Sequence, residues 1–563
     1  MLKRIVTAGL AAILLASPAL AVPKVVTLGS DATKDSDPVA ACGALAASPD
    51  EEGWQDRGLS DMQIYLDGAL PACEAALKAV PDSIDVMTWL GRVYVLVGRA
   101  SEAAPLLNEA ATGGDMFAAY LLSGLLGGTV INGVESDADR ALALLTQAAN
   151  AGFVPAANEL AERYELGTGM DADPSEALRL YQLAADNGDA HALYKLGSFY
   201  QSGTGVTQDY PKAMTLFAQA ADGGEPLGHD GVGQLYQYAQ GVEMDYLEAA
   251  EAYQKGADLG EPRSETDLAY LYEQGLGVAQ DYDKSFALLS DAADQGYGFA
   301  QAALSLHYLF GEGTGIDATK ALDLAFAAVG KQVNYAQGIV GYMYSEGLGT
   351  GRDLSAALPY FQAGSDGGDQ YSTDRIAVTN LEIACQDAAG SQYEPGGLGH
   401  GLDFSAINAK AAIAACKAAV EANPSSIGDK VWLARGYAKA KRFKDALPLL
   451  QAGTDVGNVL AQVSYADMLM GGTGVTKDPA GAVALYGLAA GKDFALAQYA
   501  LGIVYASGTG VEADPLAARK LFQAALDSGI DDAQQQLDLL DSSGDPQTTA
   551  VDLTGFGREG PAY

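Results

Sequence analysis

A pattern of apolar and polar positions recurs every 36 residues through the middle of the chain. In the copy from 189 to 224, the first apolar face repeats at three- and four-residue steps and consists of Ala192, Leu196, Gly197 and Tyr200. The second face has the same spacing and consists of Ala213, Leu216, Phe217, Ala220 and Ala221. These steps are typical of a helix, and Gly203 and Gly205 separate the two faces. Each copy therefore predicts two antiparallel helices, and a fixed period of this length indicates a stacked repeat architecture.

One aspartate keeps its register through seven copies. It stands at Asp137, Asp173, Asp209, Asp245, Asp281, Asp317 and Asp353, at the start of each predicted second helix. An aspartate at this place accepts a hydrogen bond from a free backbone N–H group and caps the helix. The alternative is a series of calcium ligands, but calcium needs six to eight oxygens around one point, and these carboxylates come one per repeat. The spacing favours capping.

The repeat resembles the Sel1-like repeat family, a relative of the tetratricopeptide repeat. The residues that carry the resemblance are Leu196, Gly197, Tyr200, Gly203, Gly205, Val206, Asp209, Lys212, Ala213, Ala220, Ala221 and Gly224. The motif fits seven copies within 115–368 and two more within 458–533. The resemblance implies an all-α fold, a solenoid of stacked antiparallel helix pairs. It also implies adaptor work, in which peptides, partner proteins or envelope complexes are held. Some exported members of the family look like negative regulators of a sensor kinase or an exopolysaccharide system.

A second, longer duplication has an offset of 343 residues. Nine residues of the first copy return in the second: Pro81, Trp89, Leu90, Arg92, Tyr94, Ala103, Pro105, Leu106 and Leu107 match Pro424, Trp432, Leu433, Arg435, Tyr437, Ala446, Pro448, Leu449 and Leu450. All four cysteines belong to it, since Cys42 and Cys73 are 31 residues apart, as are Cys385 and Cys416. In an exported protein this repeated spacing predicts two disulfides, Cys42–Cys73 and Cys385–Cys416. A metal site is the alternative, but no Cys-x-x-Cys motif or histidine cluster supports it.

These patterns predict the domain organisation. The expected segments are a signal peptide (1–21), a disulfide-clipped helical hairpin (38–83), a tetratricopeptide-like pair (84–114), seven Sel1-like repeats (115–368), a linker with a second clipped hairpin (369–426), a second tetratricopeptide-like pair (427–457), two Sel1-like repeats with a capping helix (458–541) and a disordered tail (542–563).

The first 21 residues have the pattern of a secretory signal. Lys3 and Arg4 precede a short apolar run, and Ala19-Leu20-Ala21 is a typical cleavage site. The first cysteine, Cys42, is too far from this site for a lipid anchor, and no later stretch has 18 continuous apolar residues. The expected location is therefore the bacterial periplasm or the exterior of the cell.

The formal net charge is −39, and removal of Lys3 and Arg4 would bring it to −41. Such a field repels nucleic acid and anionic membranes and favours a cationic partner protein or peptide. The simpler explanation, solubility of a long solenoid or a salty habitat, has the greater weight.

The sequence contains no recognisable catalytic or cofactor motif. There is no His-Glu-x-x-His and no Gly-x-Ser-x-Gly. We therefore expect neither an enzyme nor a metal or cofactor site. The enzymatic alternative is β-lactam binding or hydrolysis, which is associated with cysteine-rich Sel1-like proteins. Those have a cysteine pair in each repeat, whereas the cysteines here lie outside the Sel1-like repeats.

The expected binding surface is the concave face that the first helices of such solenoids form. Counting from the fixed Leu and Tyr of each repeat predicts a groove that includes His191, Tyr194, Ser198, Gln201, Gln234, Tyr270, Glu273, Phe299, Tyr335 and Tyr342. Its character changes from acidic near Glu162 and Glu165 to aromatic near Phe299 and Tyr342. Two alternatives stay open: the apolar members, with Leu306 and Leu309, could pack between repeats, and the chain could be a passive structural spacer.

Overall fold

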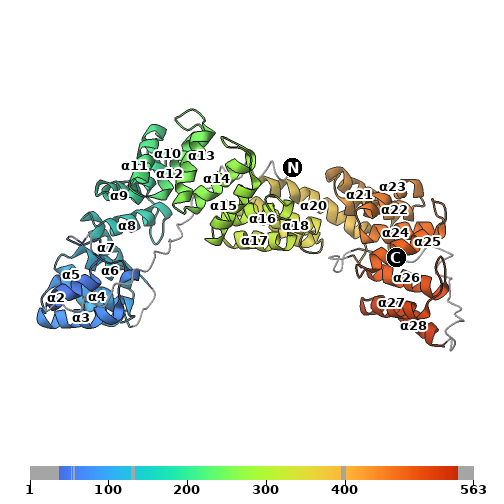
Figure 1. The fold of residues 1–563 in the computed structure, drawn as a ribbon, viewed down its shortest axis with the longest axis horizontal. Helices are drawn as coiled ribbons and strands as arrows, with labels where there is room; N and C mark the ends of the chain where they lie inside the picture. The colour runs from blue at the N-terminus through green and yellow to red at the C-terminus, as the bar shows by residue number, and fades with distance from the viewer. Residues whose placement is uncertain (1–36, 52, 55–57, 129–132, 395–400, 543–563) are drawn as a thin grey trace. The chain divides into compact units, whose positions relative to one another are not determined.

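The computed structural model describes residues 37–51, 53–54, 58–128, 133–394 and 401–542. Within these ranges the chain forms 27 α-helices and two short 3-10 helices, and no β-strand (Figure 1). The predicted all-α fold is therefore confirmed. The predicted signal peptide and all but the first residue of the predicted tail lie outside the described residues.

The described helices divide into two compact units, whose boundary in the sequence falls between Gln295 and Gly296. The N-terminal unit contains α2 (Pro38–Ala46), η2 (Asp61–Gln63), α3 (Leu66–Ala79), α4 (Ile84–Leu96), α5 (Ala100–Thr112), α6 (Met116–Gly127), α7 (Ala138–Asn150), α8 (Val154–Leu166), α9 (Pro174–Asp186), α10 (Ala190–Ser202), α11 (Tyr210–Asp222), α12 (Pro226–Gln237), α13 (Tyr246–Asp258), α14 (Pro262–Gln274) and α15 (Tyr282–Asp294).

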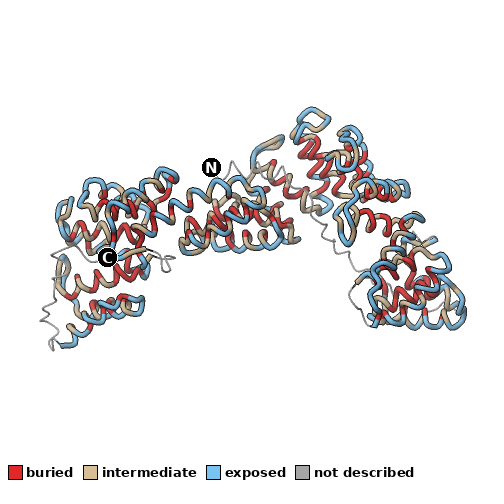
Figure 2. The backbone as a smooth tube through the Cα atoms, turned by 180° about the vertical axis from the view of Figure 1, so that it is seen from behind, coloured by how far each residue is buried: buried red, intermediate tan, exposed pale blue. Residues whose placement is uncertain are grey.

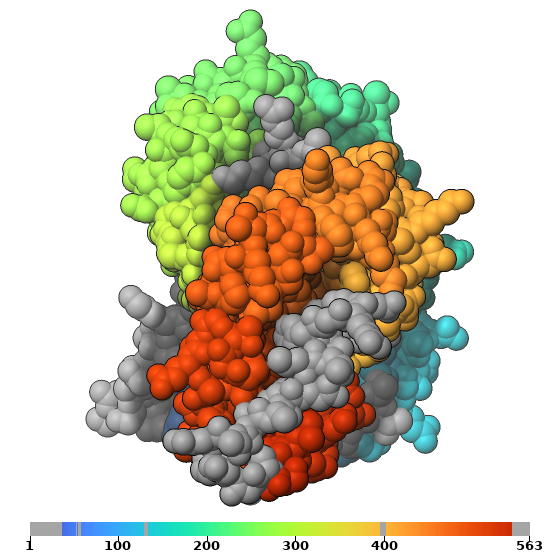
Figure 3. Space-filling view, turned by 90° about the vertical axis from the view of Figure 1, so that its right-hand side faces the viewer, coloured from blue at the N-terminus to red at the C-terminus, as the bar shows by residue number. Residues whose placement is uncertain are grey.

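The C-terminal unit contains α16 (Gly298–Phe310), α17 (Ala318–Gly330), α18 (Asn334–Glu346), α19 (Leu354–Asp366), α20 (Gln370–Ala389), η3 (Phe404–Ala406), α21 (Ala409–Ala422), α22 (Ile427–Lys439), α23 (Phe443–Asp455), α24 (Val459–Gly471), α25 (Pro479–Ala490), α26 (Ala495–Ser507), α27 (Pro515–Asp527) and α28 (Asp532–Ser542). Its last helices follow one another in sequence order, from orange to red in Figure 3.

Within each unit, every helix packs against the next one along the chain. The apolar positions of the repeat form the core between these helices, and Leu196, Ala213 and Phe217 are all buried. Buried residues accordingly lie along the inner sides of the helices in Figure 2, with exposed residues on the outer turns. The 36-residue pattern thus marks the contacts that hold each helix pair together and stack it on its neighbours.

The periodic aspartates cap the second helices, as predicted. Each of the seven side chains accepts a hydrogen bond from a backbone N–H group in the first turn of the helix that it precedes. For example, Oδ1 of Asp209 accepts from the amide of Lys212 at 3.0 Å. The side chain therefore satisfies an otherwise unpaired donor at the start of the helix.

In several Gly-x-Gly loops the second glycine brings neighbouring repeats into close contact. Gly277 has φ +68°, and a Cβ atom there would lie 2.3 Å from the backbone of Tyr246, the first residue of α13 in the preceding repeat. Gly205 meets the backbone of Pro174 in the same way, at 2.8 Å. The loop of one repeat therefore lies directly on the helix start of the repeat before it, and only glycine leaves room for this contact.

Both predicted disulfides are present. Cys42 is bonded to Cys73, joining α2 to α3, and Cys385 is bonded to Cys416, joining α20 to α21. The described residues contain no free cysteine.

The segment expected to contain a linker is helical. Helix α20 runs without interruption from Gln370 to Ala389, packs against α18 and α19 of the seventh repeat, and also packs against α21 and α22 of the second disulfide module. Solenoid stacking therefore continues through this segment within the C-terminal unit. A Sel1-like repeat and the disulfide module share this one helix.

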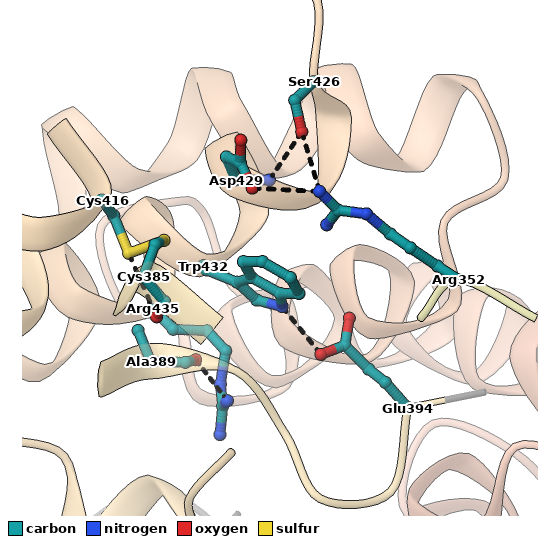
Figure 4. The surroundings of a disulfide bond; sticks show 9 residues. All are labelled: Arg352, Cys385, Ala389, Glu394, Cys416, Ser426, Asp429, Trp432 and Arg435. Carbon is teal, nitrogen blue, oxygen red and sulfur yellow. Dashed lines mark hydrogen bonds and ion pairs between the residues drawn. A yellow bond between two sulfur atoms is a disulfide. The ribbon is translucent and has the colours of Figure 1, made fainter. Parts of the chain in front are cut away.

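Arg352 reinforces this joint from the loop before α19 (Figure 4). Its Nη2 lies 3.2 Å from Oδ1 of Asp429 and also donates to Ser426, and its guanidinium lies over the ring of Trp432 at 4.5 Å from the centroid. The Asp429 side chain is fully buried. The seventh repeat thus supplies the positive charge that pairs with a buried carboxylate of the disulfide module.

Candidate functional site

The first helices of the repeats lie on the inner side of each stack. Contacts between first helices of consecutive repeats join α10 to α12 and α12 to α14 in the N-terminal unit, and α16 to α18 and α18 to α20 in the C-terminal unit. Among the described residues, contacts between consecutive second helices are sparser. Since the inner side of a curved stack brings its helices closer together, the first helices form the concave face. This is the face on which the sequence places the groove.

Nine of the ten predicted groove residues are half-buried on first helices, so that part of each side chain reaches the surface. Gln234 is the exception. It is buried, and its Nε2 donates to Oδ2 of Asp230 at 2.9 Å. Gln234 therefore belongs to the interior of the stack, and we correct its assignment to the open face.

Several groove positions of the N-terminal unit make polar contacts. Nδ1 of His191 lies 3.2 Å from Oε2 of Glu225, and the amide of Gln201 donates to that of Gln240 at 2.8 Å. Ser198 donates to the carbonyl oxygen of its own helix at Tyr194, 3.2 Å away. Each of these contacts orients a side chain on the inner face.

Tyr194 takes part in a contact that spans three first helices. Its hydroxyl accepts a hydrogen bond from Nη1 of Arg263 at 2.9 Å, although the two residues belong to α10 and α14. The same guanidinium lies 3.9 Å from Oδ2 of Asp230 on the intervening helix α12. One arginine thus connects three consecutive repeats across their inner face.

Tyr270 and Glu273 lie one turn apart near the end of α14. Burial raises the pKa of Tyr270, and the neighbouring Tyr246 and Glu273 raise it further. The phenol therefore stays neutral and able to donate a hydrogen bond at physiological pH.

The predicted groove positions of the C-terminal unit are aromatic. The rings of Phe299 and Tyr335 are 6.1 Å apart, and the Tyr335 hydroxyl donates to the backbone carbonyl of Phe299 at 3.0 Å. Tyr342 is half-buried, and burial, followed by the charge of Glu346, raises its pKa. These contacts hold the aromatic rings at the inner surface of repeats six and seven.

Several positions that the sequence placed in the groove take part in internal packing. Leu309 is buried, while Leu306 and Phe299 are half-buried and pack against the core of their unit. Glu165 and Gln237 accept hydrogen bonds from the buried hydroxyls of Tyr181 and Tyr253 at 2.7 and 2.6 Å. In these two repeats, whose second helix carries a tyrosine, the residue after the recurring first-helix tyrosine therefore bonds to the interior of its own repeat.

Sequence reasoning missed Asp267, which directly precedes the fixed Leu268 on α14. Its carboxyl group and that of Asp230 on the neighbouring helix influence each other's pKa. Burial raises the pKa of Asp230 well above its ordinary value and that of Asp267 to about 6. The equivalent positions of other repeats carry Glu159, Lys195, Gly231, Ala303 and Ile339, so the sequence pattern did not single Asp267 out.

The described residues contain no group of three or more His, Cys, Asp or Glu side chains arranged to hold a metal ion. Nor is any of the described helices long and apolar enough to cross a membrane. The described inner face offers hydrogen-bonding groups, aromatic surface and carboxylate charge.

Comparison with known proteins gives a family and several structural neighbours. No curated protein matches the chain. A protective antigen of uropathogenic Escherichia coli with a Sel1-like repeat fold has 25% sequence identity and a TM-score of 0.44, covering 78% of this chain and 90% of its own. A Sel1 repeat protein from Oxalobacter formigenes has 26% identity and a TM-score of 0.40, covering 43% and 96% respectively. An immunity protein from Pseudomonas aeruginosa has 21% identity and a TM-score of 0.30, covering 39% and 83%.

The Sel1 repeat pattern matches nine segments, which together make up more than half of the chain. Seven run from 117 to 369, at 117–153, 154–189, 190–225, 227–261, 262–297, 298–328 and 334–369. The other two are 459–494 and 495–530, so that both predicted sets are found. This chain belongs to the Sel1 repeat family.

Proposed function

We propose that this Sel1 repeat scaffold binds a partner protein or peptide on the concave face of its first helices. The observation that carries the proposal is the mixture of side chains on that face: the fixed Leu and Gly positions point into the core, while half-buried residues that differ from repeat to repeat reach the surface. A scaffold that is constant inside and varied on one face is suited to selective recognition.

The proposed place of action is the periplasm or the outside of the cell, with regulation of envelope or exopolysaccharide signalling as the specific role. The two disulfides support an oxidising compartment, because such bonds persist there and are rare in the cytosol. The proposed mode of action is binding without catalysis. Nitrocefin hydrolysis by the purified protein at a rate above that of a buffer control would contradict this part of the proposal.

The test is site-specific photo-crosslinking in cells of the source organism. A photoreactive amino acid would replace Tyr270 in the N-terminal unit or Tyr342 in the C-terminal unit, both half-buried on first helices. The matched controls are Gln219 on α11 and Asp323 on α17, exposed positions on second helices of the same units.

We expect one protein to be captured from a first-helix position and not from its control. Equal capture from both faces would contradict binding on the concave face. Absence of capture from any position would favour the alternative, a passive spacer.

A further inference from the structure

Helix α20 combines the counterparts of two helices that stand at the ends of the units. Its last residues correspond to α2 through the 343-residue duplication, and its first residues correspond to α28, because repeats 334–369 and 495–530 are 161 residues apart. Ser542 ends α28 and Pro38 begins α2, and by these two offsets both correspond to Leu381 within α20. The joint therefore shows how an end of the type of α27 and α28 packs on a start of the type of α2 and α4.

Two contacts carry the seventh repeat onto the face of the second disulfide module. Leu354, the first residue of α19, is 1% exposed and belongs to the core of that module. Arg352 pairs with Asp429 and lies directly on Gly428, where an added Cβ atom would be 2.0 Å from its Nη1. One apolar side chain and one cation thus cover this face.

The equivalent face of the first disulfide module is more exposed. Val80 and Ile84 are each 37% exposed, although both are apolar. Their counterparts at the joint are Asn423, which is 7% exposed, and the half-buried Ile427. The end of a soluble solenoid normally presents a polar outer face. Exposed apolar side chains here therefore indicate a surface that another element covers.

The last helices of the C-terminal unit have an exposed face as well (Figure 1). Pro515 is half-buried at the position of the buried Leu354, and Leu540 is half-buried at the position of the fully buried Thr379. Both positions are apolar at this end, and both are less covered than their counterparts at the joint. The outer face of α27 and α28 is therefore suited to an apolar contact.

The two end faces differ from the joint in matching ways. Three residues of the joint, Arg352, Asp429 and Gly428, have as their counterparts at the ends Ala513, Val86 and Asp85. The charged pair is replaced on both sides by apolar residues, so an equivalent contact would bury no unpaired charge at these two positions. The small side chain of Ala513 leaves room for that of Asp85, as Gly428 leaves room for Arg352.

We propose that two copies of this chain associate end to end, with α27 and α28 of one copy packing on α2 and α4 of the other. The contact repeats the packing of the internal joint with apolar residues in place of the ion pair. It joins two different surfaces, so each copy keeps one end for a further copy. The inference goes beyond the proposed function, since the concave face takes no part in it.

Charge opposes this contact and makes it dependent on salt. Asp82 and Asp85 are exposed at one end face, Asp538 is exposed on α28, and the net charge of the chain is −39. Salt screens repulsion between such carboxylates, whereas it does not weaken apolar burial. Association should therefore strengthen as the salt concentration rises, the opposite of an interface held by ion pairs.

The experiment is sedimentation velocity of the purified full chain over a range of protein concentrations. It is run in about 0.1 M and about 1 M NaCl, where the Debye length is about 10 and about 3 Å. Val80→Glu places a charge on the first end face, and its control is Leu259→Glu, since both residues are exposed apolar C-caps in the N-terminal unit. Ala513→Glu alters the other end, and its control is Ala172→Glu, an exposed alanine at the same place in the second repeat.

We expect the average mass of the wild type to rise with protein concentration, and more steeply at the higher salt concentration. Val80→Glu and Ala513→Glu should each weaken association about tenfold, while both controls behave as the wild type does. A constant mass of one chain under all conditions would overturn the proposal, as would equal weakening by variants and controls.

A mixture of the two variants tests the pairing of the ends. Val80→Glu keeps an intact C-terminal end, and Ala513→Glu keeps an intact first disulfide module, so one undamaged contact can form between them. The mixture should give dimers with the affinity of the wild-type contact, which also demonstrates that both variants fold. Absence of dimers from a mixture of two folded variants, as judged by circular dichroism, would contradict end-to-end pairing.

Discussion

The indole nitrogen of Trp89 donates a hydrogen bond to Glu51 at 2.8 Å, and 343 residues later that of Trp432 donates to Glu394 at 2.7 Å. The arginine three residues on is duplicated as well, since Arg92 donates to the carbonyl of Ala46 and Arg435 to that of Ala389. In both copies these bonds join two segments. One is the end of the first cysteine-bearing helix with the loop after it, and the other is the first helix of the tetratricopeptide-like pair, α4 or α22. The long duplication therefore preserves a tertiary contact.

We predict that Trp89→Phe destabilises the N-terminal unit by about 1–3 kcal/mol, because it removes a donor from a carboxyl group whose pKa burial has raised to about 7. Loss of packing contributes to any Trp→Phe change, so the measurement is a double-mutant cycle with Glu51→Leu, followed by urea unfolding. The cost of Trp89→Phe should fall when Glu51 is absent. Equal costs in both backgrounds would mean that the hydrogen bond contributes nothing.

Arg352→Gln should destabilise the C-terminal unit by about 3 kcal/mol, since it leaves the fully buried carboxylate of Asp429 without its cation. Adding Asp429→Asn should recover part of this loss. The control is Arg442→Gln, which breaks an exposed pair with Asp445 and should change stability by less than about 1 kcal/mol. If both arginine variants unfold at the same urea concentration, the joint does not depend on this pair.

Gly277→Ala should lower the stability of the N-terminal unit much more than Gly169→Ala. Both glycines have positive φ, so both changes strain the backbone, but only at position 277 would the new Cβ strike the neighbouring repeat; none of the described atoms comes within 4 Å at 169. Thermal unfolding of the two variants measures the difference. Equal shifts in Tm would indicate that the repeats separate easily enough to admit a methyl group.

Asp467 should make the C-terminal unit less stable as pH rises. Burial raises its pKa to about 7, while the hydroxyl of Tyr486, 2.5 Å away, lowers it. The pKa of Asp467 is higher in the folded protein than in the unfolded one. Its contribution to the stability of the fold is therefore fully present below about pH 4 and is lost as the pH rises to 7.

Asp467→Asn removes this charge and keeps the acceptor for Tyr486. The variant should therefore exceed the wild type in stability above pH 7, by at most about 4 kcal/mol, and the difference should shrink towards pH 4. Unfolding free energies measured between pH 4 and 8 provide the test. A constant difference across this range would show that Asp467 titrates normally.

The sequence by itself determined the features that depend on short-range periodicity. The 36-residue pattern identified the helix pairs, because apolar residues at helical spacing must face a neighbour. The register of Asp209 and its equivalents identified the caps, since an N-cap bond spans only a few residues. The repeated spacing of the four cysteines identified the disulfides.

Only the tertiary structure decided how side chains from different repeats combine. Arg263 lies 69 residues from Tyr194, and Arg352 lies 77 residues from Asp429, so no local pattern connects them. Gln234 and Ser198 occupy equivalent positions of consecutive repeats, yet Gln234 is buried and Ser198 reaches the surface. The reason is physical: periodicity fixes which way a side chain points from its own helix, whereas burial and charge pairing depend on which residues the neighbouring repeats present to it.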